Sequence, residues 1–369
     1  MSTSSTATKM HELVGRLLDR DDAAVSPLSI QLCLAMLLAG ARNDTHVQLC
    51  AFLGVDPEHE HDFLTASRRL RDELTAELAS VQVDMASALF CAGGVKPAYK
   101  SLCAERLDAE VRPLASGSAI NAWVAERTKG MISEVLTEDP HGPLVLVQAL
   151  VFAAKFLYRF DPADTKPAMF DCHRPAGESD PLPVQMMTMT ASLRYTGDNG
   201  VQVVELPYGT PGDSSFVAYV FLPRGQRDLR SIVQRLIADR EVFDEIVDCL
   251  EDTDVQLSLP KFSLDSAASI ADALKAMGVE AAFDAAADFG RITDEDAFVQ
   301  DVLHAVRLEV NEKGTKAAAA TAAILTTRGG GGRRKDPVVM TVSSPFAFVV
   351  AHPATKTLLF AAVVSNPVA

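Results

Sequence analysis

The hydrophobic positions in the first third of the chain mostly follow helical spacing. Residues 10–19 and 26–40 predict two helices, and the second is apolar on nearly every side, which is typical of a helix buried at the centre of a fold. Ser26 followed by Pro27 predicts a serine cap and a proline in the first turn of this buried helix. Amphipathic patterns predict two more helices, over 62–78 and 119–136.

Strand patterns dominate the rest of the chain. Residues 81–90 alternate in part, and residues 143–156 form a long apolar run typical of a strand buried on both faces. Proline and glycine bound three further predicted strands, over 201–209, 214–223 and 255–264. A hairpin pair is predicted later, over 345–353 and 357–367. Because the strands follow the helices without alternating βαβ units, the pattern indicates an α+β fold.

The composition is that of a globular protein with a sizeable core. The 369 residues are 48% hydrophobic and 22% charged, without the bias of a disordered, collagenous or disulfide-rich chain. The formal net charge of −15 repels nucleic acids and anionic lipid. No apolar run reaches the length of about 18 residues that a membrane span needs. We therefore expect neither a nucleic-acid partner nor a membrane partner.

Cysteines and motifs narrow the chemistry further. The six cysteines are irregularly spaced and include no C-x-x-C pair, so we expect free thiols in a reducing compartment. No apolar stretch follows a basic start at the N-terminus, so we expect no signal peptide and a cytoplasmic or otherwise intracellular protein, with unconventional release left open. The sequence contains no enzyme, phosphate-loop, dinucleotide or metal motif, so we expect no enzymatic activity, cofactor or metal.

Residues 314–335 break the pattern of strands, because they are first small, then glycine-rich and then basic. Such a segment inside a compact domain is usually either functional or a disordered linker. Alanine is the best helix former, so the run of small residues alone favours a helix. A helix does not account for Glu312, Gly314 and Thr315 at its start, or for the strand patterns on both sides.

The segment 304–322 resembles the hinge of the serpin family, in which a glutamate ends a strand, Gly and Thr follow, and alanines lead into the reactive loop. The corresponding hinge residues here are Glu312, Gly314, Thr315, Ala317, Ala318, Ala319, Ala320 and Thr321. Other serpin-like stretches occur in the family's order, among them SPLSI (26–30), VQALVFAAKF (147–156), DPADTKPAMF (161–170), VELPYG (204–209) and LPKFSLD (259–265). The resemblance therefore covers nearly the whole chain.

The resemblance implies one serpin domain over residues 1–369, with about nine helices around a large central β-sheet and two smaller sheets. It also implies an exposed reactive-centre loop, with its hinge, within residues 313–337. In this family a protease cleaves the loop, and the loop then inserts into the central sheet and traps the covalent acyl-enzyme. We therefore expect a monomeric suicide-substrate inhibitor that is not itself an enzyme.

The hinge sequence suits insertion into a sheet. Side chains alternate between two faces along a strand, so each face of the loop must fit against its surroundings. Nearly all side chains up to Ala323 are small, and the only charge, on Lys316, can reach solvent on its long stem. Gly314 can serve as the pivot because glycine permits backbone angles that other residues avoid. No proline interrupts residues 314–336.

Serpins usually place the scissile residue sixteen positions after the hinge glutamate, which gives the bond Arg328–Gly329 here. Arginine at this position suits a trypsin-like serine protease, whose specificity pocket can offer a carboxylate for a bidentate ion pair. A papain-like cysteine protease that accepts arginine is the alternative partner. The loop continues through GGGGRRKDP and is longer than is common in the family, so Arg333 and Arg334 are alternative scissile residues.

The resemblance also places two regions that control opening of the central sheet. Ser26 and Ser29 fall in the polar cluster called the shutter, together with His304 from a neighbouring strand. Gln148 stands where the family has an asparagine, and its extra methylene changes the geometry of a buried hydrogen-bond network. Phe156 replaces the family's tryptophan at the breach, where the loop enters the sheet, and so lacks the N–H donor.

Two other functions stay open at this point. A non-inhibitory serpin, acting as a carrier or chaperone, commonly has bulky, charged or proline residues in its hinge, and this chain does not. An unrelated binding module with a disordered loop over 314–335 would form no covalent complex with trypsin.

Overall fold

The computed structural model describes residues 2–76, 80–173, 179–197, 200–212, 215–225, 228–315 and 336–368. The predicted hinge residues 317–321, the predicted reactive bond 328–329 and the alternative scissile residues 333–334 lie outside the described residues.

Nine α-helices occur within the described residues, most of them early in the chain. They are α1 (Ser2–Leu17), α2 (Pro27–Gly40), α3 (Asn43–Leu53), α4 (Glu60–Leu74), α5 (Pro97–Leu107), α6 (Gly117–Arg127), α7 (Leu229–Ile232), α8 (Arg240–Asp248) and α9 (Ala271–Ala276). Ser26 caps α2 by accepting a hydrogen bond from the Ser29 N–H (3.3 Å), as predicted. The helix predicted over 119–136 is shorter than expected, because Lys129 and Gly130 take positive φ angles of 54° and 75° and turn the chain.

The central sheet has six strands in the order β10-β11-β12-β4-β2-β3, and β11 also pairs directly with β4. Its strands are β2 (Val81–Cys91), β3 (Glu110–Pro113), β4 (Leu144–Lys155), β10 (Phe262–Ser269), β11 (Val299–Asn311) and β12 (Gly314–Thr315). The long strand predicted over 143–156 is β4, and nearly all of its side chains are buried, as expected of a strand covered on both faces.

The second sheet has nine strands in the order β1-β15-β14-β8-β7-β6-β9-β13, with β5 paired to β6. Its strands are β1 (Ala24–Val25), β5 (Lys166–His173), β6 (Ser179–Thr196), β7 (Val201–Pro207), β8 (Val217–Pro223), β9 (Glu251–Pro260), β13 (Val338–Thr341), β14 (Phe346–His352) and β15 (Thr357–Val364). The two smaller sheets implied by the resemblance are joined here, because the long β6 pairs with β5, β7 and β9. The predicted terminal hairpin is the antiparallel pair β14–β15.

The single strand predicted over 255–264 is in fact two strands in different sheets. Pro260 ends β9 and has no N–H for a ladder, while the Lys261 N–H donates to the Gln185 carbonyl (2.9 Å). β10 then starts at Phe262 and pairs with β11 in the central sheet.

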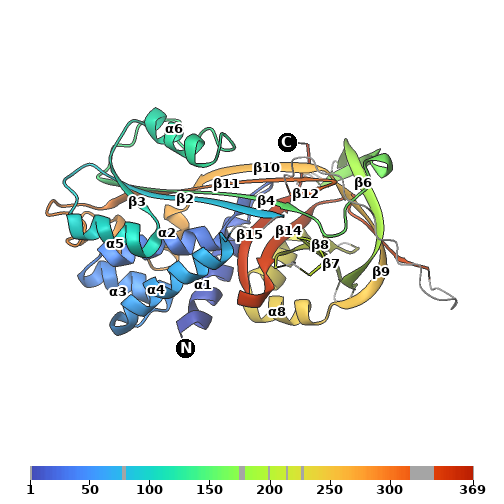
Figure 1. The fold of residues 1–369 in the computed structure, drawn as a ribbon, viewed down its shortest axis with the longest axis horizontal. Helices are drawn as coiled ribbons and strands as arrows, with labels where there is room; N and C mark the ends of the chain where they lie inside the picture. The colour runs from blue at the N-terminus through green and yellow to red at the C-terminus, as the bar shows by residue number, and fades with distance from the viewer. Residues whose placement is uncertain are drawn as a thin grey trace.

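The central sheet lies between two layers of other structure (Figure 1). Helix α6 covers one face, where Ile120 and Trp123 share an apolar cluster with alternate residues of β4. Helix α2 runs beneath the opposite face and is buried along nearly its whole length. At one end of that face the nine-stranded sheet packs against the central sheet, and Phe152 and Phe360 belong to the shared core. The hinge strand β12 pairs with the last residues of β4 and β11.

As expected from the cysteine spacing, none of the six cysteines, all of which lie within the described residues, forms a disulfide. Five of the six are buried. Among the described helices, none has the length and apolarity to cross a membrane.

Candidate functional site at the hinge

Strands β4 and β11 lie side by side and parallel along most of their length. Eight residue pairs join them, from Val299 opposite Leu144 to Arg307 opposite Val151. Beyond these pairs the two strands separate, and β12 occupies the space between them. Thr315 pairs with Val310 on one side and with Ala154 on the other, antiparallel to both. The first two hinge residues of the loop therefore already form a short middle strand.

Gly314 occupies a position that only glycine fits. Its φ is +136°, which side chains with a β-carbon rarely adopt. A β-carbon at this position would also overlap the carbonyl oxygen of Ala154. The Lys313 N–H donates to Asn311 Oδ1 (3.0 Å) and holds the turn that precedes Gly314. The chain can thus reverse within a few residues and enter the space beside β11.

Thr315 is fully buried and bonds to the core. Its hydroxyl oxygen lies 2.7 Å from that of Tyr208, and burial raises the pKa of Tyr208, so the phenol stays protonated. The Tyr208 ring stacks on Phe156, with ring centroids 4.9 Å apart and planes at 14°. The Phe156 N–H in turn donates to the Lys313 carbonyl (2.9 Å). The predicted breach residue therefore lies directly beside the hinge.

Glu312 is held by two side chains from distant parts of the chain. Lys261 Nζ lies 2.5 Å from Glu312 Oε1, and Thr165 donates to the same oxygen at 2.9 Å. Burial by itself would raise the pKa of Glu312, but the hydrogen bonds from Lys261 and Thr165 lower it below the ordinary value. The carboxylate is therefore ionised at neutral pH and ties the end of β11 to both loops.

Three of these hinge partners were not predicted as site residues, namely Thr165, Tyr208 and Lys261. Each lies within a stretch that carries the resemblance, in DPADTKPAMF, VELPYG or LPKFSLD. Their position in those serpin-like stretches was the only sign in the sequence that these residues contact the hinge. The contacts themselves join residues far apart along the chain, so local spacing does not predict them.

Ser26 and Ser29 at the start of α2 lie beside the side chain of His304, which belongs to β11 of the central sheet. The Ser26 N–H donates to His304 Nε2 (2.8 Å), and the Ser29 hydroxyl donates to the Ser26 carbonyl (3.2 Å). All three residues are buried. Burial lowers the pKa of His304 to about 3, so the ring is neutral at physiological pH. Because Nε2 accepts a hydrogen bond, the neutral ring carries its proton on Nδ1.

Gln148 lies directly opposite His304 across the β4–β11 pairing. It does not bond to that ring; its Oε1 accepts a hydrogen bond from the Ser87 hydroxyl of β2 (2.9 Å). Gln148 Nε2 and His304 Nδ1 are both buried and have no hydrogen-bond partner among the described residues. The Cys33 thiol of α2 lies beside the amide, but a thiol is a weak hydrogen-bonding group. The shutter is thus incompletely bonded in this state.

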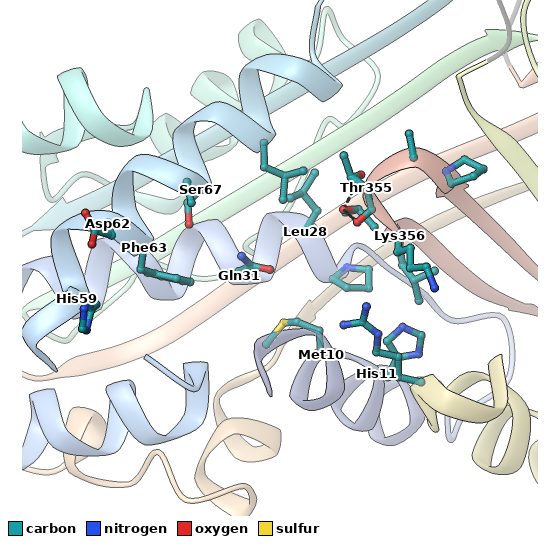
Figure 2. Close-up of a pocket in the computed structure, with 18 of the residues that line it drawn as sticks. Met10, His11, Leu28, Gln31, His59, Asp62, Phe63, Ser67, Thr355 and Lys356 are labelled. Atoms are coloured by element: carbon teal, nitrogen blue, oxygen red, sulfur yellow. Dashed lines mark hydrogen bonds between the residues drawn. The ribbon is translucent and has the colours of Figure 1, made fainter. Parts of the chain in front are cut away.

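A separate cavity of about 870 Å³ lies between α1, α2, α4 and the turn that joins β14 to β15 (Figure 2). Apolar side chains line much of it, including Met10, Leu28 and Phe63. Lys356 lies at one end beside His11, and His59 and Asp62 lie at the other. The cavity shares no lining residue with the hinge.

Comparison with known proteins agrees with this geometry. Residues 2–367 match the family model described as Serpin (serine protease inhibitor). Serpin B6 of Macaca fascicularis is 31% identical over 361 residues, covering 93% of this chain and 92% of that protein, and Iripin-8 of Ixodes ricinus is 28% identical over 362 residues, covering 93% and 87%. The solved structure of human thyroxine-binding globulin complexed with thyroxine has a TM-score of 0.88 at 22% identity, covering 100% of this chain and 99% of that one. The expected fold class is confirmed, and this chain belongs to the serpin family of serine protease inhibitors.

Proposed function

We propose that this chain is a monomeric suicide-substrate inhibitor of trypsin-like serine proteases that is cleaved at Arg328–Gly329. The observation that carries the proposal is the position of Gly314 and Thr315 between β4 and β11. A strand that continues from Thr315 in the same register runs antiparallel to both neighbours and completes a hydrogen-bond ladder on each side.

Insertion would replace the hydrogen-bond ladder between β4 and β11 with two ladders, one on each side of the inserted strand. The eight residue pairs between β4 and β11 must first part. An inserted strand of about ten residues then bonds on both sides, and each backbone hydrogen bond contributes about 1 kcal/mol net. The exchange favours the inserted state by on the order of 10 kcal/mol before the cost of ordering the loop. The intact protein is therefore metastable, and cleavage releases the restraint.

The chemistry belongs to the protease. Its serine hydroxyl attacks the carbonyl of Arg328, the bond to the Gly329 nitrogen breaks, and an ester joins the protease to the new carboxyl end. If the loop inserts before water attacks the ester, the protease is carried along and its active site is distorted. A cysteine protease would form a thioester at the same residue.

The lengths of β4 and β11 support Arg328 as the scissile residue. Continued in register, the loop places Leu325 opposite Leu144, where β4 begins, and Thr326 opposite Val299, where β11 begins. Arg328 then emerges just beyond the edge of the sheet. Cleavage at Arg333 or Arg334 would leave five or six more residues, mostly glycine, outside the sheet.

The experiment is incubation of the intact protein with trypsin at equimolar ratio, followed by a denaturing gel and mass spectrometry of the released peptide. We expect a covalent complex and a C-terminal peptide that starts at Gly329. Arg328→Ala should abolish the complex, and Arg333→Ala, the matched control, should leave it intact. Cleavage without a covalent complex, and without a rise in melting temperature, would contradict the proposal. Papain in a parallel incubation tests the alternative protease class.

The cavity between α1, α2 and α4 favours one second candidate, carriage of a small molecule with an apolar body. Its volume of about 870 Å³ is in the range of ligand sites, and its walls combine apolar and charged side chains. A structurally similar protein is thyroxine-binding globulin in complex with thyroxine. Titration with 8-anilinonaphthalene-1-sulfonate tests this function. Saturable binding that is lost in Ala66→Trp, which fills the cavity, would support this function. Binding that is unchanged in Ala66→Trp would contradict it.

We also propose an intracellular site of action. Six cysteines that form no disulfide, one of them exposed, suit a reducing compartment. Fractionation of the source cells tests this location. Recovery of the protein from the medium would contradict it.

A further inference from the structure

The cavity between α1, α2 and α4 contains an arginine whose hydrogen-bond donors are unused. Arg240 lines the cavity, and its side chain is only 20% exposed. Its ion-pair partner is Asp244, but Oδ2 of that carboxylate lies 3.8 Å from Arg240 Nε, which is too long for a hydrogen bond. None of the five N–H donors of the guanidinium therefore has a hydrogen-bond partner among the described residues. A cation so largely shielded from water favours an anion that reaches it through the cavity.

A second cation lies at the same end of the cavity. Lys356 Nζ lies 3.1 Å from the Asp244 oxygen that faces Arg240, so two cations share one carboxylate. His11 lies beside Lys356 (Figure 2). Burial lowers the pKa of His11, and its Nδ1–H donates to the Ile237 carbonyl (2.6 Å), so the ring is neutral at pH 7. The side chains that line this end therefore carry positive charge, which Asp244 offsets only in part.

The walls of the cavity beyond this end suit a hydrocarbon body. Leu28 of α2 and Phe63 and Leu70 of α4 line it. The volume of about 870 Å³ is in the range of sites that enclose a small molecule. Ser67 is 2% exposed, and its hydroxyl, which points from α4 toward the side where Gln31 of α2 lies (Figure 2), has no hydrogen-bond partner among the described residues. An occupant of the cavity can supply that missing partner.

The opposite end of the cavity is acidic but open to solvent. The side chain of Asp56 is 60% exposed, and its Oδ1 already accepts a hydrogen bond from the Glu58 N–H (3.0 Å). Asp62 is exposed as well. Water and salt screen exposed charges, so a cation paired with them would gain little. Recognition of charge in this cavity therefore depends on Arg240.

We infer that the cavity binds a small amphipathic carboxylate, with its acid group on Arg240 and its hydrocarbon body against the apolar wall of α2 and α4. A guanidinium can donate two parallel N–H bonds to one carboxylate, which fixes the orientation of the ligand as well as its charge. The inference rests on the second candidate function, carriage of a small molecule with an apolar body, and names the chemical class of that molecule. It does not depend on insertion of the loop.

The test is calorimetric titration of the full-length protein with decanoate, 1-decanol and decyltrimethylammonium, which share a ten-carbon chain and differ in charge. Each probe is used below the concentration at which it forms micelles. Decanoate should bind about tenfold or more tightly than decanol, because hydrogen bonds to a charged group are stronger than neutral ones. Decyltrimethylammonium should bind most weakly. Ala66→Trp should abolish the binding of decanoate, which would place that binding in the cavity.

Arg240→Gln tests the arginine directly. The substitution keeps N–H donors and removes the charge, so decanoate should bind about tenfold more weakly while decanol binds as before. Arg235→Gln is the matched control, because Arg235 is exposed and does not line the cavity. It should leave both affinities unchanged.

The outcomes separate this inference from the candidate function on which it rests. Equal affinity for decanoate and decanol, tightest binding of decyltrimethylammonium, or decanoate binding that is unchanged in Arg240→Gln would each overturn the inference and leave carriage of an apolar molecule standing. If decanoate, decanol and 8-anilinonaphthalene-1-sulfonate all fail to bind, the carriage function itself fails.

Discussion

The hydroxyl of Thr315 lies 2.7 Å from the hydroxyl of Tyr208, and this bond holds the end of β12 inside the central sheet. Both groups are buried, and the Tyr208 ring is fixed by its stack on Phe156. A buried hydroxyl that loses its partner destabilises the protein by more than the bond itself contributes. The contact therefore helps to hold Thr315 in its position between β4 and β11.

Replacing one partner of this pair should be worse than replacing both. Tyr208→Phe leaves the Thr315 hydroxyl buried without a partner, so we expect a loss of about 1–3 kcal/mol in unfolding free energy. The double variant Tyr208→Phe with Thr315→Val should lose less, because no polar atom is left unsatisfied. Urea unfolding of the single and double variants measures the difference. Strictly additive losses would mean that the two hydroxyls do not interact.

Gly314→Ala should impair inhibition. The substitution places a β-carbon against the Ala154 carbonyl and forces a residue with a side chain into φ +136°. We expect the hinge to move out of its position between β4 and β11. The stoichiometry of inhibition, the number of inhibitor molecules cleaved per protease molecule trapped, should then rise. Gly278→Ala is the matched control, because Gly278 also has a positive φ (+93°) but open space around it. Equal stoichiometry of inhibition in Gly314→Ala and the unmodified protein would contradict this role.

The Lys261–Glu312 pair should give a pH-dependent contribution to stability. The pKa of Glu312 is lowered in the folded protein, so its contribution is present above the unfolded value of about 4.5 and is lost as pH falls below it. Lys261→Met should therefore melt lower than the unmodified protein at pH 7, and the gap should close toward pH 3. Lys275→Met removes a lysine from an exposed pair with Asp272 and serves as the control. If the difference in melting temperature between Lys261→Met and the unmodified protein stays constant with pH, the loss of stability comes from packing and not from the ion pair.

His304 should make the protein less stable in mild acid. Its folded-state pKa of about 3 lies below the ordinary histidine value of 6.5, so the stabilisation is complete above about pH 6.5 and is lost as pH falls toward 3. His304→Gln keeps an acceptor for Ser26 and removes the titration. Between pH 6 and 4.5 the unmodified protein should therefore lose up to about 1.4 kcal/mol per pH unit more than the variant.

The histidine comparison needs a control away from the sheet. His59→Gln makes the same substitution at an exposed histidine outside the sheet and serves as the matched control. Identical profiles for His304→Gln and the unmodified protein would show that the ring does not titrate in a buried position.

The sequence predicted the features that depend on local pattern. The cap at Ser26, the buried helix α2 and the strand β4 follow from spacing and composition. The resemblance singled out Glu312, Gly314 and Phe156, which lie close together in the structure. The end of α6 at Arg127 and the division of 255–264 into two strands were not predicted, because a turn and a change of sheet decided them. Lys261, Thr165 and Ser87 bond to side chains far away in the chain, and the spacing of residues along a sequence does not predict such contacts.

If the loop inserts as proposed, the short turn between β11 and β12 requires the sheet to be filled in one direction, beginning at Thr315. Each later residue can enter only after the one before it, so an obstacle stops everything behind it. A bulky side chain near Ala317 would leave almost the whole loop outside, whereas one near Leu325 would leave almost none outside. Tolerance to substitution should therefore rise steadily with distance from Gly314, a gradient that no single contact would produce.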